Sequence, residues 1–150
     1  MITPGKVFTE MKKLSWPEAE LTVQPPNGKT LVNLLTNFYT DSPPPEPQTV
    51  TLLGQQVSIT ATPVSYTWHF GDTSRLTTNG PGAAYESGTP IQVGHTYVEA
   101  DVTVHPWVDV TYHGSYTVNG GDPEDIPEEL TVEGTPVDLQ VLTATPRLVG

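Results

Sequence analysis

The stretch YTWHFGD, residues 66–72, is the most informative part of this chain. Its aromatic residues occupy alternate positions: Tyr66, Trp68 and Phe70. Side chains two residues apart lie on the same face of a β-strand, so the pattern predicts a strand with one aromatic face. The following Gly71-Asp72 pair favours a turn, because glycine accepts positive φ and aspartate bonds nearby backbone N–H groups. A strand that buries a central tryptophan suits a two-sheet sandwich.

The composition of the chain favours the same all-β class. Its 150 residues suffice for about one domain with a sizeable core. They include 16 prolines and 13 glycines, which do not suit helix interiors but suit turns between short strands. We therefore expect about eight or nine strands after residue 48, spaced by turns as in a sandwich.

Most of the predicted strands follow residue 48. They are residues 50–53, 56–62, 65–70, 94–97, 102–105, 107–112, 115–119, 130–133 and 137–142. Between two of them, His113-Gly114 predicts the turn of a hairpin. Residues 73–94 are rich in Thr, Gly, Pro and Asn, so we expect a long loop there.

The N-terminal region contains the one plausible helix, at residues 6–14. Val7, Met11 and Leu14 have helical spacing, and the preceding Thr3-Pro4 offers an N-cap with proline at the first helical position. The alternative is a poorly ordered terminus.

Two further strands are expected before a proline-rich stretch. Residues 21–24 and 30–39 have strand-like composition, and residues 41–47 contain four prolines, which favour a stiff, extended connector. This pattern predicts three parts: an N-terminal arm at residues 1–40, a connector at 41–48 and a β-sandwich at 49–150.

Two motifs resemble the pattern of PKD domains, the immunoglobulin-like modules named after polycystic kidney disease protein. That pattern is W-x-F-G-D-G followed, after a variable loop, by H-x-Y. The matching residues here are Trp68, Phe70, Gly71, Asp72, His95 and Tyr97. Two departures are Thr73, where the pattern has glycine, and a much longer segment after Tyr97. The resemblance implies an Ig-like β-sandwich, here with an N-terminal extension and an inserted hairpin.

The resemblance also implies a setting and a set of roles. PKD domains of microbial proteins generally lie outside the cell, as spacers, adhesion elements or accessory modules, and their motif residues hold the fold together. We therefore expect a secreted or cell-surface module that binds a protein or glycan or acts as a spacer. The alternatives are an accessory domain of a larger exported hydrolase and a structural subunit of an extracellular assembly. The first 16 residues lack the apolar core of a signal peptide, so either the protein is cytoplasmic or a signal was removed; the resemblance favours the second.

Charge and length exclude several classes of partner. The net charge is −11, and residues 99–138 hold ten acidic residues with no Lys or Arg. Phosphate binding needs clustered cations, so nucleic acid is not an expected partner. No apolar run approaches the length of a transmembrane helix, so membrane insertion is not expected.

Catalytic and zinc chemistry find little support in the sequence. There is no cysteine and no G-x-S-x-G motif, so we predict that the chain is not an enzyme and has no catalytic residues. No pair of histidines has helical i, i+4 or H-x-H spacing, which argues against zinc.

Two features remain as candidate binding sites. Asp122, Glu124 and Asp125 lie within four residues, and such carboxylates are ligands for calcium, the one cofactor that the sequence suggests. The alternative is a solvated acidic turn. Trp107 lies outside the motif and precedes Val108, so its ring is expected to point away from the core and to contact a ligand. The alternative is a tryptophan that closes one end of the core.

Overall fold

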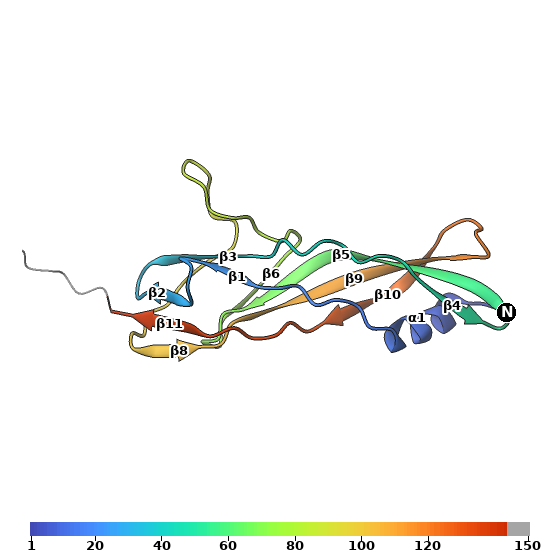
Figure 1. The fold of residues 1–150 in the computed structure, drawn as a ribbon, viewed down its shortest axis with the longest axis horizontal. Coiled ribbons are helices and arrows are strands. Elements are labelled where there is room, and N and C mark those ends of the chain that lie inside the picture. Colours follow the sequence, from blue (N-terminus) through green and yellow to red (C-terminus); the bar gives the residue numbers. More distant parts are fainter. Residues whose placement is uncertain (144–150) are drawn as a thin grey trace, which may run out of the picture.

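The computed structural model describes residues 1–143, which form an elongated, predominantly β molecule (Figure 1). In chain order the elements are α1 (Pro4–Lys13), β1 (Thr22–Gln24), β2 (Lys29–Leu31), β3 (Leu35–Tyr39), β4 (Gln48–Leu52), β5 (Gln55–His69), β6 (Arg75–Thr78), β7 (Gly94–Thr96), β8 (Val102–Val104), β9 (Trp107–Val118), β10 (Glu124–Val132) and β11 (Leu139–Leu142). The all-β class predicted from composition is confirmed.

The largest sheet has the strand order β10-β9-β5-β4, and β6 pairs with the far end of β5. The two long strands β5 and β9 are antiparallel and run along the long axis of the molecule (Figure 1). We predicted two strands where β5 is one continuous strand of 15 residues. The register shifts between Pro63 and Ser65, so an irregularity in the pairing replaces the predicted break.

The predicted hairpin at His113-Gly114 is wrong, because β9 continues through both residues. Gly114 faces the interior, where a Cβ atom would lie 2.8 Å from Met11 Sδ and 2.9 Å from Ile126 Cδ1. The glycine is therefore required by the close approach of helix α1 and not by a turn. No inserted hairpin exists at this point of the sheet.

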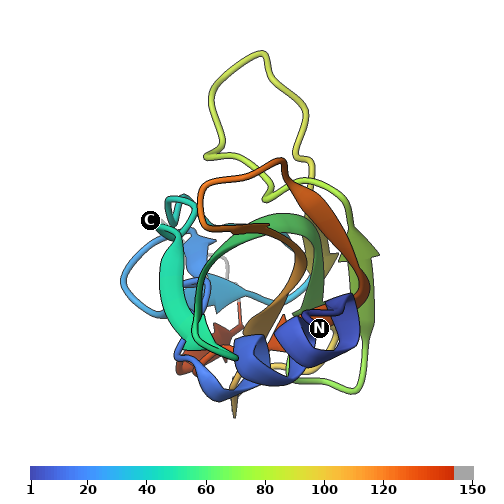
Figure 2. The same ribbon diagram turned by 90° about the vertical axis from the view of Figure 1, so that its right-hand side faces the viewer.

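Helix α1 covers the inner side of the curved sheet at one end of the molecule (Figure 2). The helix matches the sequence prediction: the Thr3 side chain caps it by accepting from the Lys6 N–H, and proline occupies its first turn. Val7 and Met11 are fully buried beneath the sheet. The next residue of the core, Trp16, donates from Nε1 to the Met11 carbonyl at 2.9 Å.

Two smaller sheets form the other end of the molecule, in the orders β1-β3-β7 and β2-β11-β8. The strand predicted at residues 30–39 is two strands, β2 and β3, which belong to different sheets. The first 40 residues, expected as an arm, thus supply strands that pair with β7 and β11 and side chains that join the common core.

The aromatic strand lies at the centre of the core. Its inward residues and the motif tyrosine are all less than one-tenth exposed, as the alternation predicts: Tyr66, Trp68, Phe70 and Tyr97. The Trp68 indole Nε1 donates to Thr78 Oγ1 on β6 at 2.8 Å, which satisfies its one polar group.

Candidate functional site

The outer side of the large sheet is a polar face. Alternation along β9, and along β5 on either side of the irregularity between Pro63 and Ser65, buries every second side chain and turns the intervening ones outward. The outward residues are Ser58, Thr60, Thr62, Ser65, Thr67 and His69 on β5, and Trp107, Asp109, Thr111, His113, Ser115 and Thr117 on β9. We call this set the polar face; hydroxyl groups dominate it, and it contains one tryptophan.

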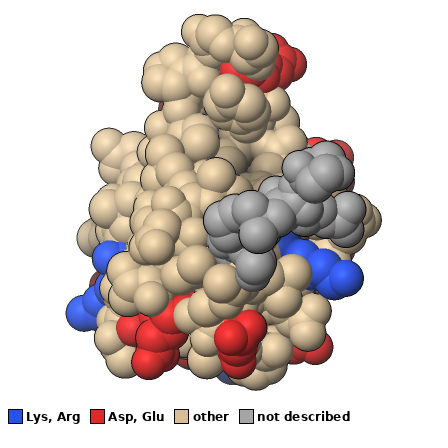
Figure 3. Space-filling view, turned by 90° about the vertical axis from the view of Figure 1, so that its left-hand side faces the viewer, with Lys and Arg blue, Asp and Glu red and all other residues tan. Residues whose placement is uncertain are grey.

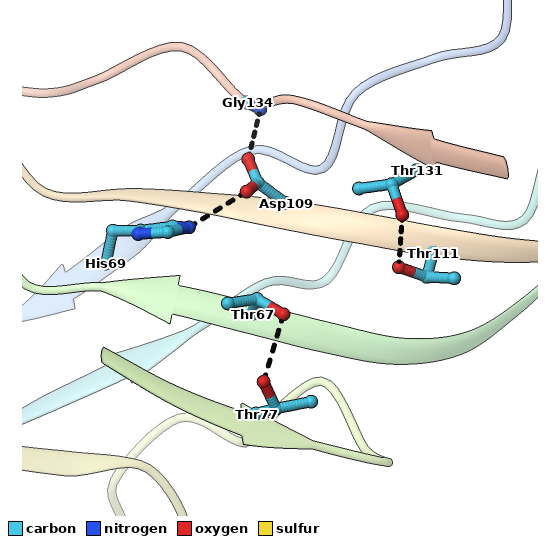
Figure 4. Close-up of polar contacts among 7 residues, drawn as sticks. All are labelled: Thr67, His69, Thr77, Asp109, Thr111, Thr131 and Gly134. Carbon is cyan, nitrogen blue, oxygen red and sulfur yellow. Dashed lines mark hydrogen bonds and ion pairs between the residues drawn. The ribbon is translucent and has the colours of Figure 1, made fainter.

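Threonine hydroxyls pair across neighbouring strands on this face (Figure 4). Thr67 Oγ1 lies 3.1 Å from Thr77 Oγ1 on β6, and Thr111 Oγ1 lies 2.8 Å from Thr131 Oγ1 on β10. Each hydroxyl has one donor and two acceptor sites, so a pair keeps capacity for a further hydrogen bond with a ligand. The pairs fix the hydroxyls in place and reduce the entropy that binding would cost.

Trp107 is the first residue of β9, and its partner His69 is the last residue of β5. The two residues lie at one end of the polar face. Their rings stack with centroids 4.1 Å apart and planes 8° apart. His69 Nε2 lies 2.9 Å from Asp109 Oδ2, and the Gly134 N–H donates to the other carboxylate oxygen at 3.3 Å (Figure 4). The carboxylate thereby orients the imidazole, and the imidazole supports the indole. We call Trp107, His69 and Asp109 the outer cluster.

The sequence predicted the outward direction of Trp107 but missed its two partners. Alternation places the His69 side chain on the face opposite that of Trp68. That His69 pairs with Trp107, however, depends on how β5 and β9 align, and these strands are distant in sequence. Nothing in the sequence around Asp109 marked it as a functional residue, apart from its position two residues after Trp107. Strand register brings the three together.

The outer cluster offers groups of the kinds that bind ligands, and it does not contain a nucleophile bonded to its histidine. A stacked indole offers an apolar ring face, and the adjacent carboxylate and hydroxyls offer hydrogen bonds. Among residues 1–143, no hydrogen bond joins a Ser or Thr hydroxyl to a histidine ring, as a Ser-His-Asp triad would require.

A second cluster of similar composition holds the PKD-like motif residues. His95 stacks on Phe70 with centroids 4.2 Å apart, and its Nε2 lies 2.6 Å from Asp72 Oδ2. The Tyr97 hydroxyl donates to the Phe70 carbonyl at 2.6 Å, and the Ser74 N–H donates to Asp72 Oδ1. We call Phe70, Asp72, His95 and Tyr97 the inner cluster; it joins the end of β5 to β7.

Gly71 lets the turn after β5 approach the end of β8 closely. Its φ is +86°, and a Cβ atom there would lie 2.9 Å from the His105 backbone nitrogen. Thr73, which replaces the glycine of the PKD pattern, also has a positive φ of 77°. The turn therefore keeps a left-handed residue at that position in spite of the substitution.

The inner cluster shifts the pKa of two of its groups. Burial alone would raise the pKa of Asp72, but hydrogen bonds from His95 and the Ser74 N–H, with the charge of His95, lower it. Burial, aided by the nearby Asp72 charge, raises the pKa of Tyr97 well above its ordinary value. The folded cluster thus favours an ionised aspartate beside a neutral tyrosine.

The acidic segment is partly strand and does not gather its carboxylates. Glu124 and Asp125 begin β10, and the Glu124 carboxylate accepts from the Tyr116 hydroxyl at 2.7 Å. Asp125 lies 3.6 Å from His113 Nε2 instead, while Asp122 precedes the strand. Within residues 1–143, no three acidic or histidine side chains form a group suited to a metal ion, so this arrangement gives the calcium prediction no support.

Every histidine of the chain has an aspartate partner. Besides His69, His95 and His113, His105 Nδ1 lies 2.8 Å from Asp138 Oδ1. The four pairs are separate from one another, and in the described chain no three of these side chains come together as a metal ion would require.

Sequence reasoning also missed an apolar groove of about 400 Å³ beside the loop of residues 79–93. Its lining combines Gln24, Pro25, Leu34, Leu35, Asn37, Tyr85 and Ile91. Asn37 Nδ2 donates to the Ala83 carbonyl and to Gln24 Oε1, which ties the loop to β1 and β3. In Figure 3 the visible surface below the protruding loop is mostly uncharged, with basic side chains at its two sides and acidic side chains along its lower edge.

This chain matches no protein-family model, no curated protein and no solved structure. The likeness to PKD domains therefore remains a prediction from the two sequence motifs. Within the described residues, no helix has the length and hydrophobicity that a membrane crossing needs.

Proposed function

We propose that this chain is a non-catalytic, PKD-like β-sandwich module that works outside the cell and binds a glycan or a protein through its polar face. The observation that carries the proposal is the outer cluster, in which Trp107 stacks on His69 outside the core. An indole that closed a core would lie among aliphatic side chains. This one lies at the end of a sheet face, next to a carboxylate and in line with rows of hydroxyls.

The chemistry of the polar face favours an uncharged, hydroxyl-rich ligand. Sugar rings have an apolar face that packs on an indole and hydroxyl groups that bond to carboxylates and threonines. The neighbouring strand β10 carries acidic residues beside the polar face, and the chain has a net charge of −11. An anionic polysaccharide would therefore be repelled. A neutral glycan therefore fits better than an anionic one.

A spacer role has separate support in the shape of the molecule. The long strands β5 and β9 run side by side through 12 paired positions and give a stiff, elongated body (Figure 1). Such a body can separate two neighbouring domains of an exported protein, including a catalytic one. Spacing and binding are compatible, because the polar face lies along the side of the body.

A binding screen with a matched control tests the proposed role. The purified chain is incubated with insoluble neutral and anionic polysaccharides and with a glycan array. Trp107→Ala should abolish retention, while Tyr85→Ala, which removes an aromatic ring 53% exposed on the protruding loop, should leave it unchanged. Equal retention of wild type and Trp107→Ala would show that binding does not use the Trp107 end of the polar face.

A further inference from the structure

The strand β4 forms one edge of the large sheet. At its start the Gln48 side chain donates to the Ser15 carbonyl at 2.9 Å, and its outer side is not paired with a strand of the described chain. Within residues 1–143, β4 pairs with β5 alone. Its sequence, QTVTL, has no charge and no proline, which are the usual devices that keep an edge strand from pairing with another chain. The opposite edge strand, β10, carries several acidic residues and a proline.

The direction of the backbone groups on β4 follows from the hairpin that it forms with β5. Leu53 and Gly54 both have positive φ, which is the pattern of a two-residue type I′ turn closed by Leu52 and Gln55. The Gln56 N–H and carbonyl bond to Asn119, on the side of β9. The pair of Gln56 with Thr51 is therefore a non-hydrogen-bonded pair.

It follows that Thr51, and by alternation Thr49, point their N–H and C=O groups away from the sheet. The core is also incomplete at this edge. On β5 the inward side chains of Val57 and Ile59 are fully buried, but on β4 the inward Val50 and Leu52 are only partly buried. An added strand would satisfy the backbone groups and cover both side chains.

We propose that a second copy of this chain occupies the edge, with the two β4 strands antiparallel about a twofold axis at Val50. In that register Thr49 faces Thr51 of the other copy, and each such pair exchanges two N–H···O bonds. Gln48 faces Leu52, and the exposed Glu46 faces Gly54, so no like charges oppose each other. Two strongly acidic chains can meet here because the edge is uncharged.

The dimer would join two large sheets into one and place both polar faces on a continuous surface. Two binding faces on one particle raise the apparent affinity for a repetitive ligand through effective concentration. The inference about the dimer does not depend on the proposed function, because association is measured without any ligand.

Cysteine cross-linking tests the register, since the chain has no cysteine of its own. Val50→Cys would face its own copy in a non-hydrogen-bonded pair, where Cα atoms about 4.5 Å apart suit a disulfide. We expect a linked dimer to form much faster than from Thr51→Cys, which faces Thr49 instead. Equal rates for the two variants would overturn the register.

Sedimentation velocity over a range of concentrations tests the association itself. The wild type should show a concentration-dependent dimer, and Thr49→Lys/Thr51→Lys should be monomeric, because lysines would face lysines across the axis. Thr60→Lys/Thr62→Lys makes the same change in charge on β5 and should keep the dimer. A wild type that stays monomeric at the highest soluble concentration, or a dimer that persists in Thr49→Lys/Thr51→Lys, would contradict the proposal.

Discussion

The inner and outer clusters use the same three kinds of group in two different places. In each, a histidine stacks on an aromatic ring and bonds to an aspartate: His95 with Phe70 and Asp72, His69 with Trp107 and Asp109. The inner cluster includes a Phe70 ring only 3% exposed, whereas the outer one lies on a sheet face.

The difference lies in what each cluster holds. The inner cluster ties the end of β5 to β7 through the Tyr97 hydroxyl, so its geometry is explained by the fold. The outer cluster joins residues of two strands that already pair through 12 positions, so the pairing of these strands does not depend on it. Beyond these two strands, the cluster is held by the Gly134 N–H, which donates to Asp109. A preorganised cluster with so small a structural task is the better candidate for binding.

The largest effect is expected for Phe70→Ala in the inner cluster. Removing this buried ring takes away its contacts with Phe38 and His95 and leaves a cavity, so the free energy of unfolding should fall by about 3–5 kcal/mol. Urea unfolding measures the change. A loss below about 1 kcal/mol would show that the inner cluster does not hold the fold together.

A smaller loss is expected for Tyr97→Phe. The ring stays in place, but the Phe70 carbonyl loses its donor inside the core, which costs about 1–3 kcal/mol. The same urea titration measures it. Unchanged stability would mean that the carbonyl finds another partner.

The stability of the inner cluster should also depend on pH on the acid side. Because the folded-state pKa of Asp72 is lowered, its contribution is present above its unfolded pKa, about 4, and is lost as the pH falls through the folded pKa. Asp72→Asn should therefore be less stable than wild type at pH 7, and the gap should narrow below about pH 4. If the difference in unfolding free energy between wild type and Asp72→Asn stayed constant from pH 7 to pH 3, the charge of Asp72 would not be its origin.

The smallest change in stability is expected for Trp107→Ala in the outer cluster. The ring is only partly buried and packs chiefly on His69, so its loss should cost about 1 kcal/mol or less. Thermal unfolding of Trp107→Ala and Phe70→Ala under the same conditions compares the two losses of stability directly. A cost as large as that of Phe70→Ala would make Trp107 a core residue.

Local pattern predicted the all-β class, the helix and the aromatic core, because these depend on alternation and caps that the residues themselves carry. The Thr3-Pro4 cap and the spacing of Tyr66, Trp68 and Phe70 are of this kind. Buried glycine misled the prediction at Gly114, since a turn and a close helix contact both require the absence of a side chain.

The candidate site was only partly predictable for a related reason. The outward direction of Trp107 follows from its neighbour Val108, but the stack with His69 depends on the register of two strands that are distant in sequence. The acidic segment shows the converse: Glu124 and Asp125 are adjacent in sequence, yet the strand directs them to Tyr116 and His113. Nearness in sequence does not fix nearness in space on a strand.

The measurement that tests the central claim most directly is polysaccharide retention by Trp107→Ala, with its melting temperature taken on the same preparation. We predict that the wild type is retained by at least one neutral polysaccharide, and that the variant loses retention while it melts within a few degrees of wild type. A variant that binds as the wild type does, or one that melts as low as Phe70→Ala, would contradict the assignment of binding to the outer cluster and structure to the inner one.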